Sequence, residues 1–172
     1  MNRNIILTGF MGSGKSTIGQ LVADKLQRNF VDMDMVIEAR ERRPISQIFA
    51  ESGEPYFRQL EANLCQELAA QTGQVIATGG GALVPEGNLW IMQKAGLVIC
   101  LDCEPEVLWQ RIGQSEDRPM LAGRDDGRFV RLEALLKQRA PAYARIERHI
   151  DVTHLSPEVI AQQICAWGDQ EC

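Results

Sequence analysis

The glycine-rich stretch from Gly9 to Ser16, GFMGSGKS, has the residue types and spacing of a phosphate-binding loop. Gly12 and Gly14 allow a tight turn in which successive backbone N–H groups point at phosphate oxygens. In this pattern the ammonium of Lys15 reaches the β- and γ-phosphates, and the hydroxyl of Ser16 holds Mg²⁺. The stretch therefore predicts binding of a nucleoside triphosphate, and it leaves open which molecule receives the terminal phosphoryl group.

Two aspartates, Asp32 and Asp34, follow the apolar residues of NFVDMD. Alternation along a strand places both side chains on one side of it. One aspartate can face the Ser16 hydroxyl and complete a Mg²⁺ shell through water, and the other can hold and deprotonate a hydroxyl acceptor. The alternative is that one of them only caps the helix that follows.

Three consecutive glycines, Gly79, Gly80 and Gly81, follow another apolar run. They either expose backbone N–H groups beside a small polar ligand or form an ordinary turn. Arg58, in YFRQLE, either binds an anion or makes a surface pair with Glu61 at a spacing of three residues.

Three further arginines lie in the second half of the chain. Arg118 belongs to a polar stretch without periodicity, where it can close over the transferred phosphoryl group as part of a lid. Arg111 either stacks on an adenine or is solvated. Arg139, one turn before Pro141, either binds an anion or complements the carboxyl end of its helix. An aspartate base with several guanidinium groups predicts an acceptor that carries hydroxyls and a carboxylate.

Apolar runs alternate with helical periods along the chain, and this alternation has to position those residues. Strands are expected at 4–9, 29–34, 74–81, 97–102 and 149–154. Helices are expected at about 15–26, from 35 through the sixties with breaks near Pro44 and Gly53, at 86–95 before Gly96, at 105–112, at 129–140 before Pro141, and from Ser156 as N-cap onward. The pattern predicts an α/β three-layer sandwich, in which helices cover both faces of a five-stranded parallel sheet. Ligands of such sheets bind beyond the carboxyl ends of the strands.

The composition favours a soluble single domain of 172 residues in a reducing compartment. The net charge is −5, so no basic field would attract nucleic acid. The sequence has no apolar run long enough for a membrane span, and its start does not resemble a signal peptide, so a cytoplasmic protein is expected.

The cysteines and histidines are expected to be structural. The five cysteines are an odd number, and Cys100 and Cys103 form a lone C-x-x-C at the end of a strand. His149 and His154 flank a strand-like stretch, and we expect no acidic or cysteine ligand set around them.

Six motifs in this order, GFMGSGKS, DMD, FRQLE, TGGG, RPML and RAPAY, resemble those of shikimate kinases over essentially the whole chain. This resemblance implies ATP-dependent phosphorylation of the 3-hydroxyl of shikimate, a step of chorismate and aromatic amino acid biosynthesis, by a P-loop kinase fold. It also implies a monomer formed by one domain, residues 1–172, with a substrate-binding region at about 34–60 and a mobile lid at about 113–126.

The resemblance also implies a role for each matching residue. The ATP phosphates would be bound by six consecutive residues, Gly12, Ser13, Gly14, Lys15, Ser16 and Thr17. Mg²⁺ would be held by Ser16 and, through water, by Asp32. Asp34 would be the base, Arg58 and Arg139 would bind the shikimate carboxylate, and Gly79 to Gly81 would contact the ring hydroxyls. Lys15 and Arg118 would complete the catalytic set, with Arg111 near the adenine.

Two other functions share the donor motif. A kinase of another sugar acid, such as gluconate, would not need the combination of Asp34, Arg58, the three glycines and Arg139. A nucleotide-gated regulator without transfer activity would be expected to lack Asp34 or Arg118, and this chain has both.

Overall fold

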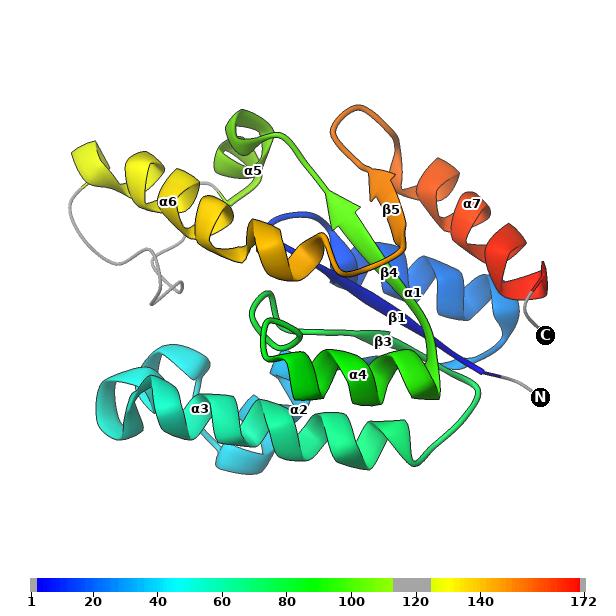
Figure 1. Cartoon of the computed structure of the whole chain (residues 1–172), viewed down its shortest axis with the longest axis horizontal. Helices are drawn as coiled ribbons and strands as arrows, with labels where there is room; N and C mark the ends of the chain where they lie inside the picture. Colours follow the sequence, from blue (N-terminus) through cyan, green and yellow to red (C-terminus); the bar gives the residue numbers. More distant parts are fainter. Residues whose placement is uncertain (1–2, 113–124, 171–172) are drawn as a thin grey trace.

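In the computed structural model, which describes residues 3–112 and 125–170, five parallel strands form one sheet in the order β2-β3-β1-β4-β5 (Figure 1). The strands are β1 (Asn4–Gly9), β2 (Asn29–Asp32), β3 (Gln74–Ala77), β4 (Gly96–Asp102) and β5 (Arg148–Asp151). The helices are α1 (Lys15–Leu26), α2 (Met33–Glu41), α3 (Ile45–Ala69), α4 (Glu86–Ala95), α5 (Pro105–Ile112), α6 (Asp125–Tyr143) and α7 (Pro157–Gln170). The predicted fold class is confirmed.

Strand β1 occupies the centre of the sheet and is buried along its whole length. Ile5 pairs in parallel with Val75 of β3 on one side and with Leu97 of β4 on the other. A strand that is covered on both faces needs apolar side chains at consecutive positions, as in the run Ile5, Ile6 and Leu7. The loop after β1 therefore emerges in the middle of the carboxyl edge of the sheet.

Two apolar clusters lie on opposite faces of the sheet. Ile5 and Leu7 pack with α1 and α7, whereas Ile6 packs with α2, α3, α4 and α6. Alternate residues of one strand point to opposite faces, so β1 contributes to both clusters. In Figure 1, α1 and α7 lie together on one side of the sheet, and α3 and α4 lie on the other. This arrangement confirms the three layers.

Helices α5 and α6 pack near the carboxyl edge of the sheet, where the ring centres of Trp109 and Phe129 are 5.9 Å apart. The expected lid lies between these helices. Arg118 and the rest of residues 113–124 are outside the described residues. No helix in the described part of the chain is long and apolar enough to cross a membrane.

Several expected boundaries are wrong. Strand β3 ends at Ala77 and β5 at Asp151, before the expected positions 81 and 154. Strand β2 ends at Asp32, so Asp34 lies in the first turn of α2 and not on the strand. Helix α6 continues beyond Pro141 to Tyr143, because a proline near the helix end removes only one N–H while Ala144 N still donates to Ala140 O at 2.9 Å. The break at Gly53, with φ 80° inside α3, and the end of α4 before Gly96 are as expected.

Candidate active site

The loop after β1 has the backbone of an anion-binding turn. Gly12 and Gly14 have φ values of +81° and +92°, a region that favours glycine, and α1 begins directly afterwards at Lys15. The ammonium of Lys15 donates to the carbonyl oxygens of Gly9 and Phe10, both at 2.9 Å, which holds it against the loop. The loop thus presents backbone N–H groups, the positive end of a helix and a lysine at one point.

Asp32 joins the phosphate-binding loop to α2. Its Oδ2 accepts a hydrogen bond from the hydroxyl of Ser16, and its Oδ1 accepts from the backbone N–H groups of Asp34 at 3.0 Å and Met35 at 3.2 Å. One carboxylate therefore caps the helix and also faces Ser16. A hydroxyl beside a carboxylate is a set of hard oxygen donors, which suits Mg²⁺.

The three glycines after β3 form a turn that is surrounded by four charged side chains. An added Cβ at Gly79 would lie 2.6 Å from Oε1 of Glu61 and 2.8 Å from Oδ1 of Asp34. One at Gly81 would lie 2.7 Å from Nη1 of Arg58. The missing side chains thus leave room for the carboxylates at one end of the turn and for a guanidinium at the other.

Arg139 approaches the middle of this turn from α6. An added Cβ at Gly80 would lie 3.1 Å from Nη1 of Arg139. The residue is 5% exposed, and its guanidinium carbon is 5.4 Å from the centre of the Phe10 ring. Nη1 is buried and has no hydrogen-bond partner within the described residues. A buried cationic donor without an acceptor is costly, and an anionic ligand would satisfy it.

Glu61 is the residue whose role the sequence interpretation missed. Its pair with Arg58, at 2.5 Å from Nη1, is not a surface pair, because Glu61 is 1% exposed. Burial raises the pKa of Glu61 to about 7 although the nearby Arg58 opposes the shift. The available signal was its position on an apolar stripe of α3 with Phe57, Leu64 and Leu68, where an acid points inward.

Tyr143 links the end of α6 to the glycine turn. Its hydroxyl donates to the carbonyl oxygen of Gly80 at 2.6 Å, and burial raises the pKa of Tyr143 to about 12. The motif RAPAY therefore supplies two contacts to the turn, one from Arg139 and one from Tyr143.

Arg111 is hydrogen-bonded to the protein backbone and is not simply solvated. Its Nη2 donates to the carbonyl oxygens of Val152 at 2.9 Å and Thr153 at 3.4 Å, in the segment between β5 and α7. The structure therefore brings Asp34, Arg58 and Arg139 together around the glycine turn, as expected. Arg111 lies at a separate point on the carboxyl edge. Arg118 lies outside the described residues.

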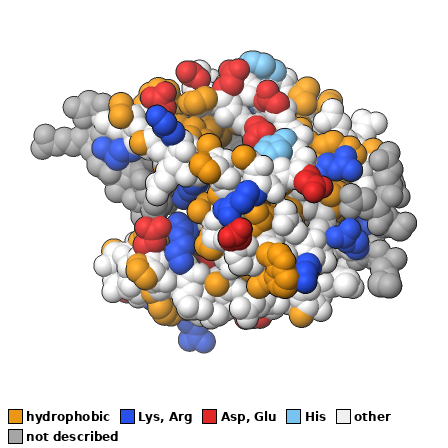
Figure 2. Space-filling view, in the orientation of Figure 1, with side chains coloured by type: hydrophobic (Ala, Val, Ile, Leu, Met, Phe, Trp, Pro, Cys, Tyr) orange, Lys and Arg blue, Asp and Glu red, His pale blue; other side chains and the backbone are white. Residues whose placement is uncertain are grey.

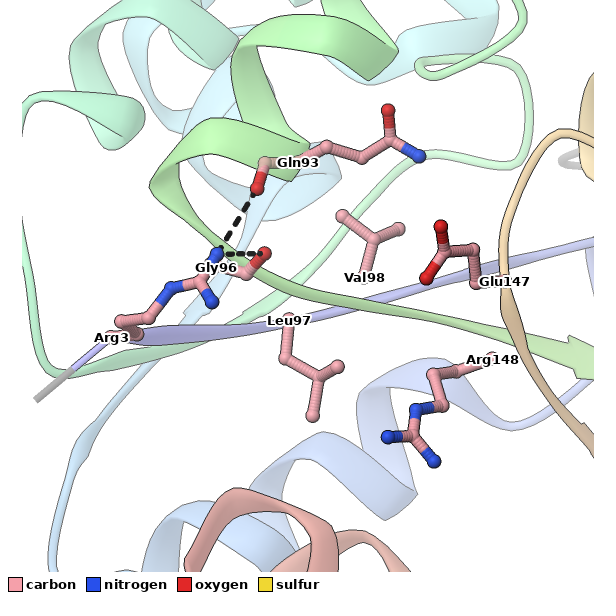
Figure 3. Close-up of a pocket in the computed structure, with 7 residues that line it drawn as sticks. All are labelled: Arg3, Gln93, Gly96, Leu97, Val98, Glu147 and Arg148. Atoms are coloured by element: carbon pink, nitrogen blue, oxygen red, sulfur yellow. Dashed lines mark hydrogen bonds between the residues drawn. The ribbon is translucent and has the colours of Figure 1, made fainter. Parts of the chain in front are cut away.

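A cavity of about 360 Å³ lies at the opposite, amino edge of the sheet (Figure 3). There Arg3 donates to the carbonyl oxygens of Gln93 at 3.2 Å and Gly96 at 3.4 Å, as the dashed lines show. Glu147 and Arg148 line the other side. None of the chemical motifs reaches this cavity, so the candidate site is the carboxyl edge.

Comparison with known proteins agrees with this geometry. The sequence model of the shikimate kinase family matches residues 11–168. The chain belongs to the shikimate kinase family. It is a small-molecule kinase.

Two relatives named shikimate kinase are similar to this chain over most of their length. The shikimate kinase of Thermodesulfovibrio yellowstonii is 39% identical over 162 residues, which are 94% of this chain and 92% of that protein. The shikimate kinase of Symbiobacterium thermophilum is 46% identical over 144 residues, 83% and 82% of the two chains.

Among solved structures, a shikimate kinase is more similar to this chain than a gluconokinase of the same fold. The shikimate kinase of Acinetobacter baumannii in complex with shikimate has a TM-score of 0.93 at 32% identity, covering 99% of this chain and 95% of that one. A gluconokinase of Sinorhizobium meliloti has a TM-score of 0.61 at 15% identity, covering 99% and 93%. The second likeness concerns the fold alone.

Proposed function

We propose that this protein transfers the γ-phosphoryl group of ATP to the 3-hydroxyl of shikimate and releases shikimate 3-phosphate and ADP, within aromatic amino acid biosynthesis. The observation that carries the proposal is the glycine turn, with Asp34 and Glu61 at one end, Arg139 at its middle and Arg58 at its other end. A hydroxylated cyclic carboxylate has groups that match both ends. The shikimate kinase of Acinetobacter baumannii, similar over nearly the whole chain, was solved with shikimate bound.

On the acceptor side, Arg58 and Arg139 bind the carboxylate of shikimate. A guanidinium fork matches a carboxylate in shape and charge, and the buried Nη1 of Arg139 would gain the acceptor that it lacks in the described residues. Asp34 accepts the proton of the attacking hydroxyl, and Glu61 orients Arg58. Gly79, Gly80 and Gly81 leave room for the ring hydroxyls beside the backbone.

On the donor side, Gly12, Ser13, Gly14, Lys15, Ser16 and Thr17 bind the ATP phosphates. Ser16 and Asp32 would hold Mg²⁺, which when bound offsets the negative charge of the phosphates. Lys15 turns from the loop carbonyls to the phosphates. Arg111 borders the adenine at the segment after β5, and Arg118 contacts the transferred group.

We further propose that residues 1–172 act as one domain and as a monomer in the cytoplasm. In this arrangement residues 34–60 bind the acceptor and residues 113–126 form the lid. Nucleic acid and membranes have no part in the reaction.

The decisive measurement is ADP release with ATP and Mg²⁺ in the presence of shikimate, gluconate or quinate. We expect strong stimulation by shikimate, with a 3-phosphate as the product by NMR. Stimulation by gluconate alone would assign the protein to another small-molecule kinase. Nucleotide binding without stimulation by any of the three acids would favour a regulator and reject the proposal.

A further inference from the structure

Three potential metal ligands meet at the carboxyl edge of β4 and β5, on the far side of β1 from the glycine turn. The Sγ of Cys100, a carboxylate oxygen of Asp102 and a ring nitrogen of His149 all lie within 4.8 Å of one another. Cys100 and His149 are register partners on the two strands, and Asp102 is two residues beyond Cys100 on the same face. The expectation that no acidic or cysteine ligands surround His149 is therefore wrong, because the pairing of β4 with β5 joins residues almost fifty positions apart.

His149 is held as a metal-binding imidazole is usually held. Its Nε2 lies 2.9 Å from the carbonyl oxygen of Ile146, which can only accept, so Nε2 carries a proton. Its Nδ1 lies 2.7 Å from Oδ2 of Asp102. A ring lone pair and a carboxylate repel each other unless a proton or a metal ion lies between them. Donation from the second ring nitrogen to a backbone carbonyl is the arrangement that orients a metal-ligating histidine.

Cys100 supplies the ligand that selects the metal. Its Sγ lies 3.5 Å from Oδ1 of Asp102, the other oxygen of the same carboxylate. Zinc binds the thiolate form of cysteine, so metal binding would release the thiol proton. Sulfur and imidazole ligands favour zinc over Mg²⁺ or Ca²⁺.

The three ligands can reach one zinc ion after a rearrangement of their side chains. Zinc bonds of about 2.0–2.3 Å in a tetrahedron place neighbouring ligand atoms roughly 3.3–3.7 Å apart. The sulfur–oxygen distance of 3.5 Å involves Oδ1 of Asp102, whereas the nitrogen–oxygen distance of 2.7 Å involves Oδ2. The carboxylate therefore has to turn so that one oxygen serves the metal together with both other ligands, which the half-exposed Asp102 side chain permits.

A cavity borders two of the three proposed ligands. A cavity of about 410 Å³ is lined by Asp102 and His149, and also by Phe10, Cys103 and Tyr143. Figure 2 shows histidine side chains on the drawn face, with acidic side chains beside them. We propose that Cys100, Asp102 and His149 bind one zinc ion, with water as the fourth ligand, and thereby join the edge strand β5 to β4.

The test is a zinc titration of the full chain without nucleotide and with Mg²⁺ in excess. We expect one bound zinc, measured by elemental analysis after dialysis, and a thiolate-to-metal charge-transfer band when cobalt is used instead. His149→Gln and Cys100→Ser should each weaken zinc binding by more than about tenfold and remove that band.

Matched controls distinguish this site from other thiols and imidazoles. Cys103→Ser and His154→Gln should bind zinc like the unaltered protein. The His149 side chain contacts Asp102 and Ile146 in the metal-free protein, so the thermal unfolding temperature of His149→Gln is measured without zinc, and zinc binding is compared at a temperature at which both proteins are folded. Absence of bound zinc, or zinc binding that His149→Gln leaves unchanged, would overturn the proposal.

Discussion

At the scale of single residues, the site contains buried charged groups that have only some of their hydrogen-bond partners among the described residues. Glu61 is 1% exposed and has one oxygen bound to Arg58, while its other oxygen is buried without a hydrogen-bond partner among the described residues. Nη1 of Arg139 is also buried without a hydrogen-bond partner among the described residues. Buried polar groups are normally satisfied, and those left over at one place indicate where a polar ligand binds.

Asp34 is assigned as the base, so Asp34→Asn should remove proton acceptance without removing nucleotide binding. We expect kcat to fall by about 10²- to 10⁴-fold, measured by coupled ADP release, with the affinity for ATP nearly unchanged. The matched control is Asp24→Asn, at an exposed position of α1. Near-normal turnover of Asp34→Asn would refute the assignment.

Arg139→Lys keeps the positive charge but removes the guanidinium fork. Losing a charged hydrogen bond to the substrate should raise the KM for shikimate by about 10- to 100-fold and leave the KM for ATP close to its original value. Arg145→Lys is the control, because Arg145 is more exposed and donates to a carbonyl outside the site. If Arg139→Lys instead weakened ATP binding selectively, Arg139 would belong to the donor side.

At the scale of elements, the glycine turn after β3 is the point at which helices from two regions meet. Helix α3 brings Glu61 and Arg58 to it, and α6 brings Arg139 and Tyr143. The kink at Gly53 divides α3, so the segment that carries Arg58 begins a new helical direction near Pro55. The orientation of the turn therefore depends on contacts between elements as well as on its own flexibility.

Tyr143→Phe tests the link between α6 and the turn. The lost hydrogen bond to Gly80 should raise the KM for shikimate by about 2- to 12-fold, with little change in the KM for ATP. The control is Tyr56→Phe, which removes the other tyrosine hydroxyl of the chain, one that contacts Glu41 on the surface. Equal changes in both KM values would indicate a general structural role and not positioning of the turn.

At the scale of the whole molecule, the strand order separates the two ends of the carboxyl edge. Strands β2 and β3 lie on one side of β1 and bring Asp32 and the glycine turn beside the phosphate-binding loop. Strands β4 and β5 lie on the other side and carry the proposed zinc ligands. The net charge of −5 is spread over the molecule, and Figure 2 shows both signs interspersed on one face. Binding of anionic ligands therefore depends on the lysine and arginine side chains that the fold places at the site, and not on the net charge.

The pH dependence of the free energy of unfolding should reflect the raised pKa of Glu61. Its folded-state pKa of about 7 lies above the ordinary value of 4.5, so its contribution to stability is fully present below about pH 4.5 and is lost as the pH rises to about 7. The free energy of unfolding of the unaltered protein relative to Glu61→Gln should fall over this window by on the order of 1–3 kcal/mol, as measured by urea denaturation at a series of pH values.

Glu67→Gln is the matched control on the same helix. Hydrogen bonding to Arg40 lowers the pKa of Glu67, so its contribution is lost only as the pH falls below the ordinary range. A flat difference between the unaltered protein and Glu61→Gln from about pH 4.5 to about pH 7 would contradict the buried, proton-binding state of Glu61.

The local sequence by itself determined the donor half of this protein and the type of its fold. The glycines, lysine and serine of GFMGSGKS, placed between a strand and a helix, suit the binding of phosphates. Apolar strands that alternate with helices form a parallel sheet because both faces must be covered. The acceptor roles that we propose for Asp34, Arg58 and Arg139 come from motifs in a family-like order.

Only the tertiary structure decided how these residues meet. It showed that Asp32 caps α2 and faces Ser16 at once, that Glu61 is buried, and that His149 lies against Cys100 and Asp102. Short-range rules describe what a segment can form. Burial and pairing between distant segments arise from strand order and helix packing, which bring residues together regardless of their separation along the chain.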